Sequence, residues 1–561
     1  MFLFIGPYCI LLLKYLIFYS YFYLLGKFLF SLILKFTNEK KSTESILYTK
    51  AEYIYPLLGI IFLGNLLILF NFFLPLEYSS YLLVALLLLS LTSLNNFDFD
   101  IKKYININNL FSYLLIPGIL VISTYDTSFN YDAGYYHLLH QSWLRESNLI
   151  IGTVNIFWAL GMSSIYEYLS AVLWFDTTFV LLHLLNVYFI HFFYLFLKGS
   201  LLNKKSVILM NTSFIILIYS ILDNIGFGGG RNGFIYIQGV TKQDITVGIL
   251  FWFLSIVILK KIIDKSIEPY EVLTLSLIAF FIYEIKVSGV FIFLVYAVFI
   301  FYMLKRKIIP IKKLFYIHIP VLFFAIVWFS KSILTTGCLI FPVDITCLPI
   351  FDWYVPGSTW SYEYHTKLSS KAYDFSIPLS QWIQETGAFE FRKQVFLNFS
   401  IAFFILFIFR LFSYESSSQD KTIKIISFSY IAINTLYLFF YGPIPRYLIG
   451  ICLLIISMIG FFAGKPKFLL SKYLKYSLIF FSVFLLVRST SYTSLLSNQE
   501  LRIFDPRTNV EINQEIGFTE ISGNWVTPPE GDQCWANIKC IPSGEGVNFK
   551  ERGLFKVAYK P

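Results

Sequence analysis

The sequence predicts an all-α fold, a polytopic bundle of transmembrane helices, from its composition and from the length and pattern of its apolar runs. Of the 561 residues, 57% are hydrophobic and only 14% are charged, and the mean hydropathy is +0.68. Apolar runs recur at lengths near the roughly 20 residues that a helix needs to cross a bilayer. They lack the alternation of a membrane barrel, and backbone groups inside a bilayer must bond to one another, so we expect helical spans.

The apolar runs predict about fourteen spans. The first run is long enough for one tilted helix or two short ones, and it is too long for a signal peptide, so we expect it to be retained. The predicted spans are 3–34, 55–75, 79–93, 108–124, 177–197, 206–223, 246–262, 270–285, 287–304, 314–331, 396–414, 425–441, 446–463 and 473–490.

The distribution of Lys and Arg predicts the orientation of the bundle. Basic residues gather in alternate loops, which the positive-inside rule places in the cytoplasm. The net charge of +10 follows from this topology, and the basic residues form no continuous stripe for nucleic acid. The segments expected on the extracytoplasmic side are 125–176, 224–245, 332–395 and 491–561.

Four of the six cysteines occur as two close pairs in these external segments. Cys338 and Cys347 form one pair, and Cys534 and Cys540 form the other, on the oxidising side where disulfides persist. Neither pair has the spacing of a zinc site. We therefore expect two disulfides.

The chain divides into a transmembrane domain, residues 1–490, and an extracytoplasmic tail, residues 491–561. The domain has two large external loops, 125–176 and 332–395, and the aromatic stretch 154–175 reads as a helix lying in the membrane interface. Below about 80 residues a core usually needs a staple or a partner surface. The disulfide-stapled tail is therefore expected to pack on the external face.

The polar segment Tyr131-Asp132-Ala133-Gly134-Tyr135-Tyr136-His137 carries the candidate chemistry. A carboxylate at the membrane surface can take a proton from a hydroxyl nucleophile if its surroundings tune its pKa, so Asp132 is the candidate general base. The alternative is a carboxylate that caps the next helix. His137 and His140 share a helical face and are candidates to bind a phosphate or to serve packing alone, and His137 could join Asp132 in holding a divalent metal, Mg or Mn. Tyr131 and Tyr136 are further candidates to bind substrate.

Two basic residues lie at predicted external turns, against the positive-inside tendency, which raises the question of which anion they meet. Lys286 follows Glu284-Ile285, and Arg446 follows Pro443-Ile444-Pro445. Arg grips a phosphate bidentately, whereas Lys acts as a point charge. For Lys286 the alternatives are snorkelling to lipid headgroups and pairing with Glu284.

Three other features have a structural alternative beside the functional one. Asp244 is a second candidate acidic residue of the substrate site, or an N-cap. The glycine-rich run 228–233 is a hinge candidate and not a phosphate-binding motif, because no strand precedes it. His183 lies on an apolar span and is expected to hydrogen-bond within the bundle.

The first external loop resembles that of the GT-C glycosyltransferases, which take a sugar from a polyprenyl-phosphate carrier. The resemblance rests on Tyr131-Asp132-x-x-Tyr135-Tyr136, a basic-acidic pair and then Gly152. It implies that Asp132 is the catalytic base. The chain is also similar to uncharacterised bacterial membrane proteins, through the segment 337–342 and Cys534-Trp535. It departs from the GT-C pattern in having Ala133 where Glu often follows the Asp, and in placing four spans before the loop.

These observations predict an inverting membrane glycosyltransferase of the bacterial inner membrane, with its site facing the periplasm. The expected partners are the membrane lipid, a polyprenyl-phosphate sugar and a glycan, lipid or protein acceptor. Two other classes stay open, a polysaccharide polymerase or ligase and a lipid-linked-glycan flippase or transporter. A transporter needs charged or broken helices deep in the bundle, whereas most ionisable residues here lie at span ends.

Overall fold

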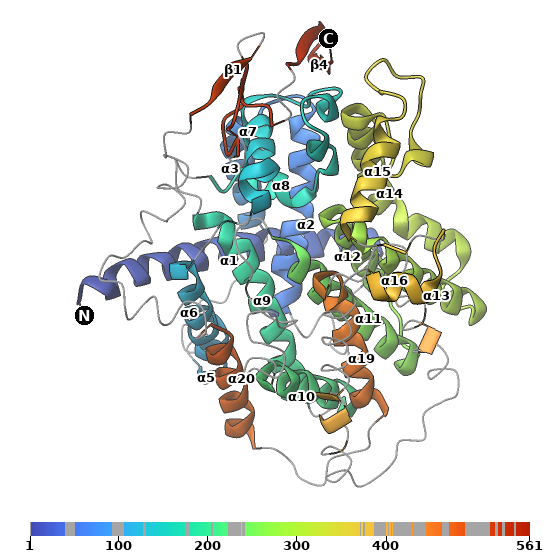
Figure 1. The fold of residues 1–561 in the computed structure, drawn as a ribbon. Helices are drawn as coiled ribbons and strands as arrows, with labels where there is room; N and C mark the ends of the chain where they lie inside the picture. The colour runs from blue at the N-terminus through green and yellow to red at the C-terminus, as the bar shows by residue number, and fades with distance from the viewer. Residues whose placement is uncertain are drawn as a thin grey trace.

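The fold is a bundle of helices capped at one end by loops and two small β-ribbons (Figure 1). The structure is a computed structural model. It describes residues 2–39, 51–92, 106–126, 129, 131–174, 180–203, 206–222, 237, 242–370, 372–373, 376–385, 400–401, 403–405, 407, 428–429, 432, 445–462, 471–487, 517–521, 525–529, 533–542 and 546–560.

The longer helices form the bundle, and short turns connect them. The α-helices are α1 (Phe2–Phe36), α2 (Ala51–Asn71), α3 (Ser79–Leu91), α5 (Ile107–Leu110), α6 (Ile116–Val121), α7 (Leu138–Glu146), α8 (Ile165–Ala171), α9 (Val180–Leu201), α10 (Val207–Leu222), α11 (Asp244–Asp264), α12 (Pro269–Ile285), α13 (Ile292–Lys305), α14 (Ile311–Thr336), α15 (Ser358–Ser370), α16 (Leu379–Glu385), α19 (Ile449–Phe462) and α20 (Lys472–Val487). Single-turn elements are η1 (Leu76–Tyr78), η3 (Phe111–Leu115), η4 (Ile122–Asp126), η5 (Ala133–His137), η6 (Thr153–Asn155), η7 (Trp158–Met162), η9 (Val287–Phe291), η10 (Asp344–Thr346) and η11 (Pro445–Leu448).

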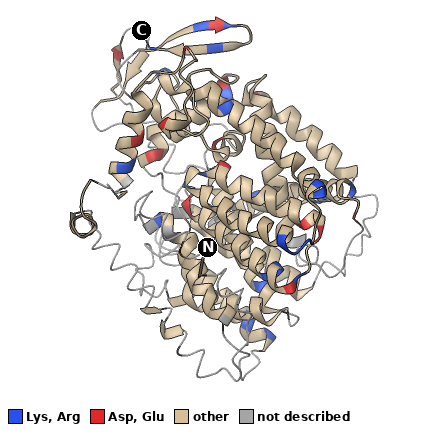
Figure 2. Cartoon of the chain, turned by 90° about the vertical axis from the view of Figure 1, so that its right-hand side faces the viewer, with Lys and Arg blue, Asp and Glu red and all other residues tan. Residues whose placement is uncertain are grey.

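Seven helical stretches in the described ranges are long and apolar enough to cross a membrane, which is compatible with an integral membrane protein. Most of the ribbon carries neither acidic nor basic residues (Figure 2). Every predicted span coincides with a helix except 396–414 and 425–441, which lie largely outside the described residues, as does the glycine run 228–233. The first apolar run is a single helix, α1, so the alternative of two short helices is wrong.

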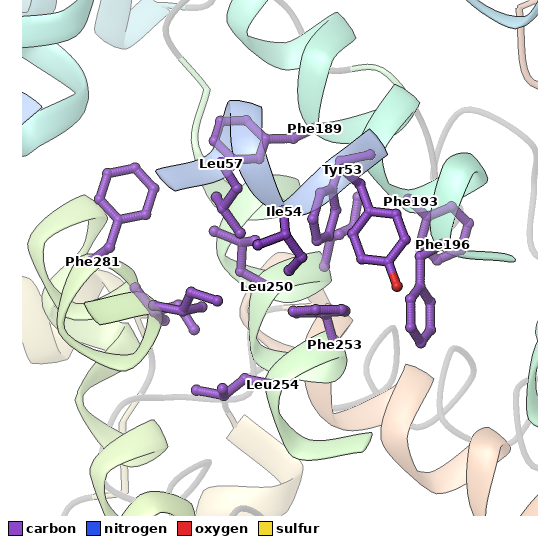
Figure 3. Packing of buried hydrophobic residues seen from close by; sticks show 14 of the residues in the cluster. Tyr53, Ile54, Leu57, Phe189, Phe193, Phe196, Leu250, Phe253, Leu254 and Phe281 are labelled. Atoms are coloured by element: carbon purple, nitrogen blue, oxygen red, sulfur yellow. The ribbon is translucent and has the colours of Figure 1, made fainter. Parts of the chain in front are cut away.

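Aromatic and branched side chains from α2, α9, α11 and α12 fill the centre of the bundle (Figure 3). Tyr53 on α2 meets the rings of Phe192, Phe196 and Phe253 edge-on, with centroids 5.5, 5.7 and 6.0 Å away. Edge-to-face contacts of this kind add to the free energy that burial alone supplies. The same helices hold the segments that carry the candidate site residues.

Two glycines let α1 and α2 approach closely. A Cβ atom at Gly26 would lie 1.6 Å from the Tyr55 carbonyl oxygen, and one at Gly59 would lie 2.3 Å from the Phe22 carbonyl oxygen. Small residues at such crossings allow helix backbones to pack in contact, as membrane helices commonly do.

Both predicted disulfides are present, Cys338–Cys347 and Cys534–Cys540. The segment 154–175 contains the single turns η6 and η7 and the short helix α8, so it is not the one helix that the sequence predicts. Its position in the membrane interface stays a prediction. His183 bonds to Ser123 at 3.0 Å, as expected for a residue inside the bundle.

The tail adds β-structure that the all-α prediction did not include. Strands β1 (Thr519–Ile521) and β2 (Trp525–Thr527) form one antiparallel ribbon, and β3 (Asn548–Arg552) and β4 (Phe555–Tyr559) form another. Their register pairs Glu520 with Val526 and Lys550 with Val557. Each ribbon has only two strands, so it needs a partner surface for stability.

The tail packs on the first large loop, at the end of the molecule where α7 and α8 lie (Figure 1). The backbone N–H of Ala558 donates to the Ile151 carbonyl at 2.8 Å, and the Trp535 N–H donates to the Gly134 carbonyl at 2.9 Å. Trp353 of the second large loop joins Ile151 and Val557 in one buried cluster. The three segments predicted to share a side therefore meet at one end of the bundle.

Gly134 packs directly against the tail, and it provides a test of this packing. A Cβ atom there would lie 2.1 Å from Gln533 Oε1 and 2.7 Å from the Trp535 ring. We expect Gly134→Val to lower the free energy of unfolding by about 1–3 kcal/mol, because the inserted atoms push the tail away. Thermal melting in detergent measures this. Gly517→Val is the control because nothing lies within 4 Å of its Cβ position; equal melting of both variants would contradict the contact.

Candidate active site

Asp132 lies at the start of η5, where the polar loop turns into α7. It occupies the N-cap position of that turn, but its side chain makes no capping hydrogen bond. Its Oδ2 atom instead accepts a hydrogen bond from the Lys242 ammonium, in an ion pair that joins residues 110 positions apart. The capping interpretation of Asp132 is therefore wrong for its side chain.

Lys242 keeps Asp132 ionised. Burial raises the pKa of the Asp132 carboxyl, but the hydrogen bond and charge of Lys242, together with the charges of His137 and Arg446, outweigh it, and the net pKa is lowered. The Asp132 side chain is one-third exposed. An ionised carboxylate that reaches solvent can accept a proton from an approaching hydroxyl group.

A second charged cluster gathers around Asp244, the first residue of α11. Its carboxylate is buried and bonds to Lys286 Nζ at 2.5 Å, and its other oxygen lies 3.8 Å from Arg446 Nε. Gln243, and not Asp244, holds the N-cap position. The N-cap interpretation of Asp244 is therefore wrong, and so is the alternative pairing of Lys286 with Glu284.

The cations of this cluster keep their charge and remain accessible. Burial lowers the pKa of Lys286 and of Arg446, but the Asp244 carboxylate outweighs it in each case, so both pKa values are raised. The Arg446 side chain is 41% exposed, and the Lys286 side chain is 30% exposed. Both cations also face the Tyr447 ring, at 5.4 and 4.7 Å from its centroid. One buried anion for two cations leaves positive charge for a bound anion.

A small cleft adjoins these cations. Its polar end is formed by Asp244, Ser288, Arg446 and Tyr447, and its apolar walls come from α11, η9 and α19. The cleft therefore joins segments that are far apart in the sequence.

His137 belongs to a third polar group, centred on Glu167 of α8. The buried Glu167 carboxylate pairs with His137 Nδ1, accepts from Gln141 Nε2 at 2.7 Å and from Gln243 Nε2 at 3.4 Å. A carboxylate bonded to one imidazole nitrogen fixes the tautomer and the orientation of the ring. Glu167 thus positions His137 beside Asp132.

Tyr136 interacts electrostatically with the acidic residue of each of the three groups. Burial raises its pKa well above the ordinary value, and the negative charges of Asp132, Glu167 and Asp244 raise it further. The phenol therefore stays protonated and can donate a hydrogen bond.

The remaining predicted substrate residues lie less centrally. Tyr131 is 60% exposed and packs its ring 5.3 Å from that of Tyr135. His140 is buried, and burial lowers its pKa to about 4, so it is neutral near neutral pH. A neutral, buried imidazole is poorly suited to binding phosphate, and His140 serves the packing of α7.

The structure brings together Asp132, Tyr136, His137, Asp244, Lys286 and Arg446, and it adds Lys242, Glu167 and Tyr447, which sequence reasoning did not select. Lys242 could have been selected as a cation in a predicted external segment, two residues before Asp244. Glu167 gave another signal, an acidic residue in an otherwise apolar aromatic stretch.

The described residues contain no group of three or more His, Cys, Asp and Glu side chains placed to hold a metal ion. The Asp132 carboxylate is bonded to Lys242, and His137 Nδ1 is bonded to Glu167. The two residues therefore do not form a ligand set by themselves, and a divalent metal at this position stays a prediction.

An apolar groove of about 410 Å³ opens beside the loop. Side chains from α1, α2, α3, α8 and α9 line it, and Lys14 is its one charged lining residue. Leu173 lines the groove and also packs with Leu138 and Trp535, next to the Asp132 turn. An apolar groove of this kind can hold part of a hydrocarbon chain.

A family profile matches residues 9–453 of this chain. The chain belongs to the DUF8201 family. That family is described as a domain of unknown function, so DUF8201 membership assigns no activity. The DUF8201 match contains Asp132, Lys242, Asp244, Lys286 and Arg446, and it ends before the tail. No curated protein and no solved structure matches the chain.

Lys242 provides a test of the electrostatics of the site. Lys242→Met removes the group that lowers the Asp132 pKa, so we expect that pKa to rise. A carboxyl group whose pKa is lower in the folded state than in the unfolded state stabilises the fold. This contribution is full at pH values above the unfolded pKa, about 3.9 for Asp, and is lost as the pH falls through the folded pKa. We therefore expect wild type to melt above Lys242→Met at neutral pH, and the difference to shrink in acid.

Thermal melting across this pH range measures the difference. Lys539→Met is the control, because this exposed lysine in the tail takes part in no ion pair among the described residues. A gap between wild type and Lys242→Met that stays constant into acid would contradict the assigned pairing.

Proposed function

We propose that this protein is an integral membrane glycosyltransferase of GT-C type, which moves a sugar from a polyprenyl-phosphate donor to an extracytoplasmic acceptor. The observation that carries the proposal is the meeting of an accessible, ionised Asp132 with Lys242, Lys286 and Arg446 from distant segments. Sugar transfer from a lipid phosphate requires these two functions, a base for the acceptor and cations for the leaving phosphate.

In the proposed step, the Asp132 carboxylate takes the proton of the acceptor hydroxyl group as its oxygen attacks the anomeric carbon. The bond from that carbon to the phosphate oxygen breaks, and its electron pair leaves with the phosphate. Lys286 and Arg446 bind the phosphate and stabilise the developing negative charge. Direct attack inverts the anomeric centre.

Three residues prepare this step without taking part in bond exchange. Lys242 keeps Asp132 ionised between turnovers and has to yield its contact when the acceptor binds. Glu167 holds the buried His137 ring, whose charge acts on Asp132. Tyr136 supplies a phenol donor.

The apolar groove supports a lipid-linked donor, because it can hold part of a hydrocarbon chain and its lining residue Leu173 packs next to the Asp132 turn. In this proposal the bundle spans the bacterial inner membrane about fourteen times. The loops 125–176 and 332–395 and the tail face the periplasm, and the donor enters sideways from the outer leaflet.

The second candidate is a lipid-linked-glycan flippase or transporter. It is favoured by two buried ionisable residues, Glu284 at the end of α12 and Lys331 on the candidate membrane helix α14. Both residues lie at the ends of predicted spans, 270–285 and 314–331, and both are buried. Flux of labelled lipid-linked sugar across vesicles without covalent product would support this candidate over the transferase.

Asp132→Asn tests the base. We expect transfer of labelled sugar from a polyprenyl-phosphate donor to fall by about 100-fold or more, because the amide cannot accept the proton. Membranes carrying each variant are compared by the rate of product formation. Asp352→Asn is the matched control, since this carboxylate is 68% exposed at the same end of the molecule. Full activity of Asp132→Asn would remove the base from the mechanism.

Arg446→Gln tests the phosphate site. We expect kcat/KM for the donor to fall by about 10- to 100-fold, the effect of losing one charge-assisted hydrogen bond in the transition state. Arg552→Gln serves as the control, because this side chain is 62% exposed and lies in the tail. An unchanged kcat/KM for Arg446→Gln would argue against phosphate binding by this guanidinium.

A further inference from the structure

A buried polar contact between α2 and α12 is not used by the proposed reaction. Glu284 lies one residue before the end of α12 and is 1% exposed, and Asn65 on α2 is 2% exposed. A buried ionisable residue in a membrane bundle is expensive, and such residues usually have a function.

Each residue of this pair has one oxygen without a hydrogen-bond partner among the described residues. Asn65 Nδ2 donates to Glu284 Oε2 at 3.1 Å and to the Ile61 carbonyl at 3.1 Å. In the described part of the chain, the other two oxygens, Glu284 Oε1 and Asn65 Oδ1, are buried and have no hydrogen-bond partner. Both are acceptors, so they cannot bond to one another unless a proton lies between them.

Lys331 on α14 is close but does not complete the pair. It is 2% exposed and interacts electrostatically with Glu284, yet the described residues contain no ion pair between them. Its ammonium lies over the Trp328 ring at 3.7 Å and near the Tyr168 ring at 6.0 Å. Aromatic faces therefore hold this cation.

We propose that Glu284 and Asn65 form a proton-binding site, in which Glu284 Oε1 carries a proton at neutral pH and donates it to Asn65 Oδ1. One proton satisfies both unpartnered acceptors and closes a cyclic acid–amide pair with the Asn65 Nδ2 bond already present. The neutral acid also avoids the cost of a carboxylate in an apolar bundle. When the proton leaves, the charge of Lys331 acts on the new carboxylate.

Other titratable groups on the packed helices are engaged elsewhere. Asp244 on α11 bonds to Lys286, Glu167 on α8 bonds to His137, and Lys305 lies at the opposite end of α13. Tyr283 precedes Glu284 on α12 and interacts with it electrostatically. Lys331 is thus the charged group that faces Glu284.

The proposed proton site lies directly beside the donor site. Glu284 is two residues before Lys286, and the intervening Ile285 carbonyl accepts a hydrogen bond from Ser164 of the α8 segment at 2.6 Å. Proton release at Glu284 would change the charge at the end of α12 that carries Lys286. The inference itself needs only the α2–α12 contact and holds for a transferase or a transporter.

Infrared difference spectroscopy of the full chain in lipid nanodiscs at neutral pH tests the proposal. We expect wild type to show the carbonyl stretch of a protonated carboxyl group and Glu284→Gln to lose it. Asn65→Leu should shift this band, because the acid stays but its amide partner is gone. The control is Glu363→Gln on external helix α15, which should leave the band unchanged. Identical spectra for wild type and Glu284→Gln would overturn the site.

Melting temperatures distinguish a protonated Glu284 from two alternatives, an ionised Glu284 paired with Lys331 and a Glu284 that binds a cation. A Gln at 284 can donate to Asn65 Oδ1 and accept from Nδ2, so we expect Glu284→Gln to keep the wild-type melting temperature. A large loss for Glu284→Gln that Glu284→Gln/Lys331→Met recovers would show an ionised pair instead, and would overturn the proposal. Wild-type stability that falls when choline replaces sodium, with Glu284→Gln unaffected, would show a bound cation and would also overturn it.

Discussion

The cost of placing charge at the edge of an apolar bundle governs the arrangement of the site. A carboxylate removed from water has to find a cation or several hydrogen-bond donors. Each acid here has a different solution: Asp132 pairs with Lys242, Asp244 with Lys286 and Arg446, and Glu167 with His137 and two amides. These pairs connect the first loop to α11, α12 and η11. The same contacts that neutralise the charges therefore bring the reactive groups together.

The outer end of the bundle keeps this arrangement in place. The loop that carries Asp132 is short of regular structure, and it is covered by the tail, whose Trp535 bonds to Gly134 and whose β4 strand pairs with the Ile151 segment. Two disulfides hold the tail and the second large loop in their local conformations. The family match ends before the tail. The matched part contains the charged residues, and the tail packs over the loop that carries Asp132.

The charged groups differ in their burial and in how many of their polar atoms already have a partner. Asp244 and Glu167 are buried and use their oxygens fully, which suits structural and positioning roles. Asp132 and Arg446 are partly exposed and each keeps capacity for a further partner. Glu284 and Asn65 are the opposite case, buried groups with one acceptor left open on each. The distribution separates a partly exposed group of charges from a buried polar pair inside the bundle.

The sequence by itself determined the membrane character, the positions of most helices, both cysteine pairs and the choice of Asp132, Lys286 and Arg446 as candidates. These follow from local signals, namely apolar length, cysteine spacing and charges that stand out against their surroundings. Only the tertiary structure decided the partners. The Asp132–Lys242 pair spans 110 positions. Lys286 pairs with Asp244 and not with its near neighbour Glu284, whose side chain bonds to Asn65 on another helix. Pairing in an apolar bundle depends on which helices cross near each other, and no local pattern in the sequence contains that information.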